Sequence, residues 1–246
     1  MSALDDERLK QAAQDFAQHL SETVSGFLGR PCPFRADVIE TGHFSVGEEE
    51  SGGIQLSAGG TVLLSLELSY QCHWDSSNTY LAVHKSKIAV YAGAFPKGNP
   101  LFRYEYERGL GERLPSAHLH VHAHRDAFAH VMSTAGRKSK GSRAGMMLTL
   151  GDVPQLQDFH FPQGGHRFRP CLEDILATLK EEFGLDTSSQ WKDVLDAGRI
   201  KWRRQQVAAA VSDSPDEAVR VLEGMGYRVT REDEGQAERR ERVASL

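Results

Sequence analysis

Four histidines alternate with other residues in the stretch SAHLHVHAHRD, residues 116–126: His118, His120, His122 and His124. On a β-strand, alternate residues share one face and lie roughly 6.6 Å apart, so we expect the four imidazoles in one row. At most two neighbours in such a row can reach one metal ion, and a third ligand must come from another segment. The four histidines are therefore candidate ligands of a divalent metal, zinc or manganese, whose site is completed elsewhere in the fold.

The stretch LFRYEYE, residues 101–107, also has a period of two, with aromatic and charged residues in alternation. If it pairs with the histidine row as a hairpin, it brings Arg103, Glu105 and Glu107 beside the imidazoles. Glu67, from another predicted strand, is a further candidate neighbour. We expect Arg103 to bind a substrate phosphate. The predicted catalytic residues are Glu105, His118, His120 and His122.

The same pattern has a structural interpretation, in which the histidines only form a polar sheet face. Four adjacent imidazoles repel one another when they gain charge below about pH 6.5, and this repulsion has no structural benefit. A strand that needs only a polar face more usually carries Thr, Lys, Glu or Ser there. Both interpretations predict the same strand and differ in what the face does.

The run His118-Leu119-His120-Val121-His122 resembles the histidine-triad (HIT) motif of nucleotide hydrolases and transferases. The resemblance implies that His120 attacks a nucleotide phosphate, while His118 and His122 orient and protonate the reacting groups. Imidazole suits this task because it is a nucleophile, a base and a leaving group near neutral pH. Where the family motif continues with two apolar residues, this chain has Ala-His.

Three segments, LFRYEYERG, AHLHVHA and LEDILATLKEEF, are similar in order to the TumE-type toxins of toxin–antitoxin pairs. Those toxins have an Arg-Tyr-Asp strand, a histidine cluster and a helix, and here Glu105 stands where the family has Asp. The resemblance implies a role directed at RNA or at nucleotides.

The segment FHFPQGGHRFRP, residues 159–170, combines His160 and His166 with two glycines and two arginines, just before a predicted helix. Backbone N–H groups at a helix start, with arginines close by, suit a phosphate. We therefore list Arg167 and Arg169 as candidate phosphate-binding residues. The alternative is a glycine turn whose arginines pair with surface carboxylates.

Two functions follow from these residues. The first is hydrolysis or transfer at a phosphoester or phosphoanhydride bond of a nucleotide or RNA, with imidazole or metal-bound water as the nucleophile. The second is a non-enzymatic module that binds a metal or a protein partner, for example one half of a toxin–antitoxin pair.

The composition and the charge argue against several classes of partner and location. The 246 residues are 39% hydrophobic and carry a formal net charge of −5, so no overall positive field favours general DNA binding. The acidic beginning MSALDDERLK does not resemble a signal peptide, and we expect neither secretion nor a membrane span. Three widely spaced cysteines in no CxxC pair favour the reducing cytoplasm over a disulfide framework.

Periodicity predicts an α+β fold with a central, mainly antiparallel sheet. The expected regions are an N-terminal helix in 1–33, a sheet domain in 34–169, a helical subdomain in 170–230 and a disordered charged tail in 231–246. Within the sheet domain, the apolar run MMLTL, residues 146–150, is predicted to form a short strand.

Overall fold

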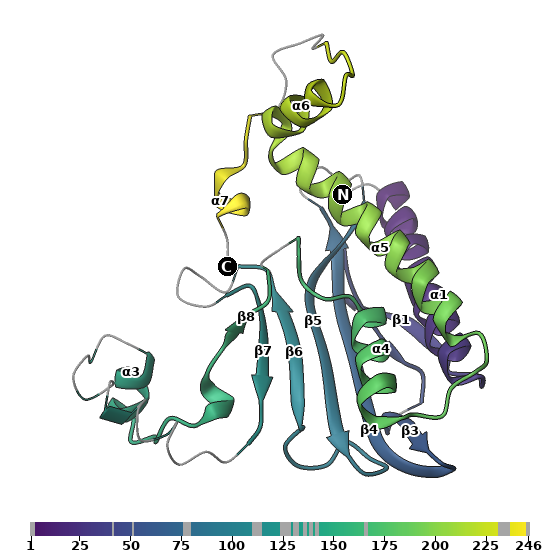
Figure 1. Ribbon diagram of the computed structural model, residues 1–246, viewed down its shortest axis with the longest axis vertical. Coiled ribbons are helices and arrows are strands. Elements are labelled where there is room, and N and C mark those ends of the chain that lie inside the picture. The colour runs from purple at the N-terminus through teal and green to yellow at the C-terminus, as the bar shows by residue number, and fades with distance from the viewer. Residues whose placement is uncertain are drawn as a thin grey trace.

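The computed structural model describes residues 3–40, 42–50, 52–75, 80–109, 115–123, 129, 133–134, 137, 140, 143–164, 167–230 and 237–244. Within these residues eight strands form one sheet in which every pairing is antiparallel. An N-terminal helix and C-terminal helices accompany it, which confirms the predicted α+β class (Figure 1).

The order of strands across the sheet is β1-β2-β4-β5-β6-β7-β8, and β3 pairs with β4 beside this path. Because most neighbours in the sheet are also neighbours along the chain, hairpins account for most of the topology. The strands are β1 (Phe34–Glu40), β2 (His43–Glu48), β3 (Ile54–Ala58), β4 (Thr61–Trp74), β5 (Leu81–Ala92), β6 (Phe102–Glu107), β7 (Ala117–Val121) and β8 (Phe161–Pro162).

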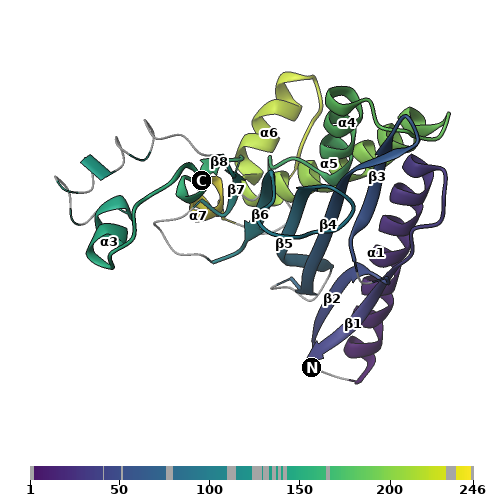
Figure 2. The ribbon, with the colours of Figure 1, turned by 90° about the horizontal axis from the view of Figure 1, so that it is seen from below.

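The helices lie mostly after the sheet in the chain, and α1 precedes it. In Figure 2, α4 and α5 lie on one side of the sheet, and α1 runs beside β1 and β2. The helical elements are α1 (Ala3–Leu28), α3 (Arg143–Thr149), the 3-10 turn η1 (Leu156–Asp158), α4 (Leu172–Phe183), α5 (Trp191–Asp213), α6 (Pro215–Gly224) and α7 (Arg240–Val243).

One hydrophobic core joins α1, the sheet, α4 and α5. Phe27 of α1, Leu66 of β4, Leu176 of α4 and Leu195 of α5 all belong to it and are at most 1% exposed. The alternation of β4 explains this packing, since its even-numbered residues from Leu64 to Trp74 are buried on the helix side of the sheet. The predicted N-terminal, sheet and helical regions thus share a core.

One local prediction is wrong. Residues 146–150 lie mostly in α3, where the Thr149 hydroxyl donates to the carbonyl of Gly145. A short apolar run forms a strand only beside a partner, whereas a helix satisfies its own backbone groups. Within the predicted tail, residues 240–243 form the short helix α7, where Arg242 lies 3.4 Å from the carboxylate of Asp213.

Candidate metal and catalytic site

The β6–β7 hairpin confirms the predicted pairing of the histidine row with residues 101–107. Glu105 is the direct partner of His118, and Arg103 is the direct partner of His120. Because alternate residues share a face, all four side chains lie on the side opposite the aromatic residues of β6. His118 and His120 are 4% and 3% exposed, so this is a buried polar cluster and not a solvated face.

A third histidine joins this pair from the segment between η1 and β8. Strand β8 pairs with β7, with Pro162 opposite His118, and this brings His160 over the two imidazoles. The ring centre of His160 lies 4.6 Å from that of His118 and 4.3 Å from that of His120. One nitrogen of each ring lies within 4.8 Å of the others, a grouping that can hold a metal ion. The sequence pattern predicts no more for His160 than a place in the glycine-containing segment 159–170.

The other nitrogen of each ring is held by a backbone carbonyl. Nδ1 of His118 lies 2.9 Å from the carbonyl oxygen of Pro115, Nδ1 of His120 lies 2.6 Å from that of Gln157, and Nδ1 of His160 lies 3.0 Å from that of Asp158. A carbonyl only accepts hydrogen bonds, so each Nδ1 is assigned the proton. Each Nε2 is then left for a ligand, as in metal sites oriented by outer hydrogen bonds.

Glu105 supplies an anionic oxygen beside these nitrogens. Its Oε2 atom lies 3.2 Å from Nε2 of His120, 3.5 Å from Nε2 of His118 and 3.0 Å from Nε of Arg103. Burial alone would raise the pKa of the Glu105 carboxyl, but the two imidazoles and the guanidinium more than offset burial and hold this pKa far below its usual range. The group is therefore a carboxylate at neutral pH.

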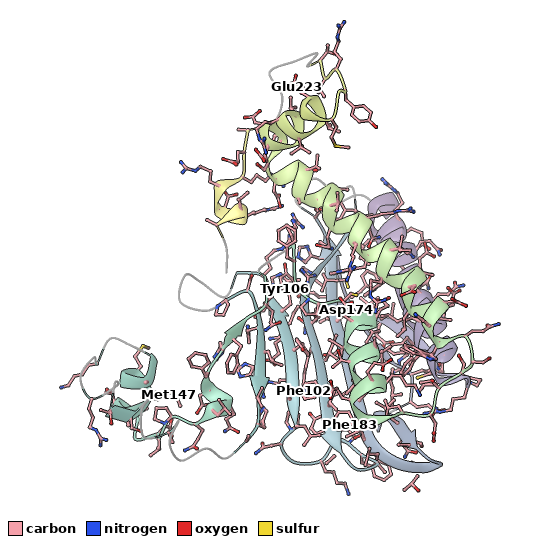
Figure 3. The ribbon with its side chains drawn as sticks, viewed as in Figure 1. Phe102, Tyr106, Met147, Asp174, Phe183 and Glu223 are labelled. Carbon is pink, nitrogen blue, oxygen red and sulfur yellow. The ribbon has the colours of Figure 1, made fainter. Side chains whose placement is uncertain are left out.

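The cluster lines a cavity of about 320 Å³. Arg103 and Lys85 contribute cations to its wall, and Met147 contributes an apolar side chain. Figure 3 shows Met147 on α3. Lys85 is already paired with Glu107 at 2.8 Å. Since Glu105 retains 26% of its side-chain exposure, solvent reaches the carboxylate.

His122 lies next to the cluster but outside the convergent group of three. Its Nδ1 contacts Oε1 of Gln157 at 3.0 Å, and its Nε2 faces Nη1 of Arg103 at 3.4 Å. Burial, together with Arg103, lowers the pKa of His122, which favours the neutral ring.

Glu67, the other predicted neighbour of the histidine row, binds Lys87 and Tyr91, each at 2.9 Å. His124 lies outside the described residues.

The structure does not bring the two candidate phosphate-binding arginines of 159–170 to this cavity. Arg167 pairs with Asp213 at 2.6 Å. Arg169 lies with its guanidinium carbon 3.8 Å from the ring centre of Tyr106 and 5.0 Å from that of Trp202 in α5. Tyr106 alternates with Glu105 along β6, so Arg169 packs on the helix side of the sheet. His166 lies outside the described residues.

The described helices include none that is long and apolar enough to cross a membrane. The three cysteines are buried. Among the described residues, none of them belongs to the group that could hold a metal ion. The donor set is therefore imidazole and carboxylate, which zinc and manganese both accept.

Comparison with known proteins adds no relative. No family model, no curated protein and no solved structure is significantly similar to this chain.

Proposed function

We propose that this protein is a metal-dependent hydrolase of phosphoester or phosphoanhydride bonds in a nucleotide or RNA. The observation that carries the proposal is that one ring nitrogen each of His118, His120 and His160 lies within 4.8 Å of the others, with the Glu105 carboxylate beside Nε2 of His118 and of His120. In this proposal the three imidazoles are the metal ligands, and zinc is the metal that fits them best.

The arrangement of protons favours a metal over direct attack by imidazole. With each Nδ1 donating to a carbonyl, Nε2 of His118 and of His120 faces the Glu105 carboxylate, so a proton or a metal ion must lie between them, and a metal ion can join the three rings at once. Zinc accepts neutral imidazole nitrogen at about 2.0 to 2.1 Å. His120, the nucleophile implied by the histidine-triad resemblance, is only 3% exposed, which disfavours direct attack of its ring on a bulky phosphate.

The residues around the metal ligands suit hydrolysis. Zinc held by three histidines lowers the pKa of its bound water to about 7, which supplies hydroxide at neutral pH. The Glu105 carboxylate is placed to accept a proton, and Arg103 is placed to offset the negative charge of a phosphate. Lys85 adds a second cation to the cavity wall.

Metal content and hydrolysis test the proposal together. The purified protein is dialysed against zinc, its bound metal is measured by mass spectrometry, and hydrolysis of bis-p-nitrophenyl phosphate, ATP and an RNA oligomer is followed. We expect about one zinc per chain and hydrolysis that a chelator abolishes. His160→Gln removes a ligand, and His84→Gln is the matched control because His84 is a histidine of β5 outside the group of three.

Loss of zinc and of hydrolysis in His160→Gln, with both retained in His84→Gln, supports the proposal. If the protein binds stoichiometric zinc but hydrolyses none of the three substrates, the proposed hydrolase activity is contradicted. The remaining function is then the metal-binding module. If hydrolysis persists in His160→Gln and in the presence of chelator, the proposed dependence on a metal is contradicted.

A further inference from the structure

We propose that Arg103 is a phosphate-binding residue that metal binding releases from Glu105. The inference rests on the metal site of the proposed function and adds a coupling between the metal and an anionic ligand. Its basis is one oxygen atom: Oε2 of Glu105 contacts the guanidinium of Arg103 and also faces Nε2 of both His118 and His120.

Arg103 and a metal ion bound by the imidazoles would compete for the negative charge of this oxygen. A zinc ion held by the three imidazoles would place two positive charges close to Oε2, while its fourth position stays open for water. The ion then neutralises the charge that now holds the guanidinium, and it repels that guanidinium. Arg103 Nε lies 3.0 Å from Oε2 but is poorly aligned for a hydrogen bond, so this contact depends mainly on charge, which a nearby metal ion would offset.

Arg103 has a second contact that keeps its guanidinium at the cavity after release. Its Nη1 atom faces Nε2 of His122 at 3.4 Å, and Nδ1 of His122 is held by the side chain of Gln157. His122 is thus a positioning residue for Arg103. The other cation of the described cavity wall, Lys85, stays paired with Glu107, so metal binding changes the charge available at Arg103 and not at Lys85.

Such a coupling is reciprocal. If zinc makes Arg103 available to phosphate, then phosphate strengthens the binding of zinc by the same factor. A hydrolase built in this way binds its anionic substrate weakly until its metal is in place.

Calorimetry with methylphosphonate, which has no ester bond to hydrolyse, tests this release. For the wild type we expect affinity to rise by about 10-fold or more when one equivalent of zinc is bound. Glu105→Gln removes the competing charge, so its zinc-free form should already bind methylphosphonate about as tightly as the zinc-loaded wild type. Arg103→Gln should lose most of the affinity of the zinc-loaded protein, and Arg103→Lys should retain part of it.

The variants show whether Arg103 or the metal alone binds the anion. If zinc-loaded Arg103→Gln binds methylphosphonate as tightly as the wild type, the metal alone holds the anion and the inference is overturned. It is also overturned if zinc-free Glu105→Gln binds no more tightly than the zinc-free wild type. Failure of the wild type to bind zinc contradicts the proposed function, whereas the zinc-free Glu105→Gln measurement tests Arg103 without any metal. Circular dichroism and thermal melting of each variant check that it is folded.

Discussion

His118 and Glu105 are direct partners across the β6–β7 hairpin, and Nε2 of His118 lies 3.5 Å from Oε2 of Glu105. This relationship is set by strand register alone. If the register of β7 shifted by one residue, the two faces of this strand would be exchanged. His118 and His120 would then lie on the helix side of the sheet, and apolar residues would lie beside the carboxylate. The hairpin therefore fixes two of the proposed metal ligands and the carboxylate at once, and only His160 depends on a more distant segment.

Gln157 is predicted to position Arg103 without supporting the metal ligands. Its side chain accepts a hydrogen bond from His122, whereas its backbone carbonyl, which any residue supplies, holds His120. In Gln157→Ala we expect zinc affinity to stay within about 3-fold of the wild type. Methylphosphonate affinity of the zinc-loaded protein should fall by about 5-fold or more. Both are measured by calorimetry.

Gln71→Ala, an exposed glutamine of β4, is the matched control and should change neither affinity. A loss of zinc affinity of about 10-fold or more in Gln157→Ala would show instead that this side chain supports the ligands, as outer hydrogen bonds do in known metal sites.

The part of the site that lies on regular strands could be predicted from the sequence. Alternation in 101–107 and in 117–124 predicts the face of each residue, and the polar faces coincide if the two strands pair as a hairpin. Arg103, Glu105, His118 and His120 are therefore found together as expected. The strand spacing also predicted that a third ligand must come from outside the row.

The remaining features depend on contacts that no local pattern encodes. His160 reaches the cluster because β8 pairs with β7, yet β8 has only two residues and no alternation to detect. Arg167 follows a glycine turn, as phosphate-binding arginines often do, but its partner Asp213 lies 46 residues later. The helix α3 replaces a predicted strand because a run of five apolar or small residues fits both elements equally well.

The cysteines are predicted to be unreactive in the folded protein. Burial raises the pKa of Cys32 to about 11 and that of Cys72 to about 12, and it also raises the pKa of Cys171. The thiolate is the reactive form, so almost none is present at pH 8. Titration with Ellman's reagent at that pH should modify fewer than one thiol per native chain and three after unfolding in urea. Rapid modification of the native protein would contradict this burial.

Asp213 is predicted to be a major contributor to stability at the end of α5. It is 2% exposed and pairs with Arg167 at 2.6 Å and with Arg242 at 3.4 Å. Asp213→Asn leaves the buried guanidinium of Arg167 without its counter-ion, which should lower the free energy of unfolding by about 3 kcal/mol. Urea unfolding followed by circular dichroism measures this change.

The control is Glu217→Gln, which breaks the exposed pair of Glu217 with Arg220 in α6 and should leave the unfolding transition unchanged. A change of less than about 0.5 kcal/mol in Asp213→Asn would place Asp213 among ordinary surface residues and contradict its role.

The ion pair between Asp174 of α4 and Arg199 of α5 is predicted to make stability depend on pH. The Asp174 carboxylate lies 2.7 Å from Nε of Arg199 and accepts from the backbone N–H of Cys171. Burial alone would raise the pKa of Asp174, but Arg199 and Cys171 more than offset it and lower that pKa below its unfolded value. Stability from this carboxylate is therefore fully present above about pH 4, the unfolded value, and is lost as the pH falls further.

Urea unfolding of the wild type, Asp174→Asn, Arg199→Gln and the double variant gives the coupling between the two side chains at each pH. We expect about 1 kcal/mol at pH 7, because Asp174 is one-third exposed and solvent screens the pair. The coupling should shrink between about pH 4 and pH 3, as the folded-state carboxyl begins to gain its proton. A coupling that stays constant down to pH 3, or that grows as the pH falls, would mean that another contact of Arg199 with α4, such as its 3.4 Å hydrogen bond to the backbone carbonyl of Glu173, links the two helices in place of the Asp174 carboxylate.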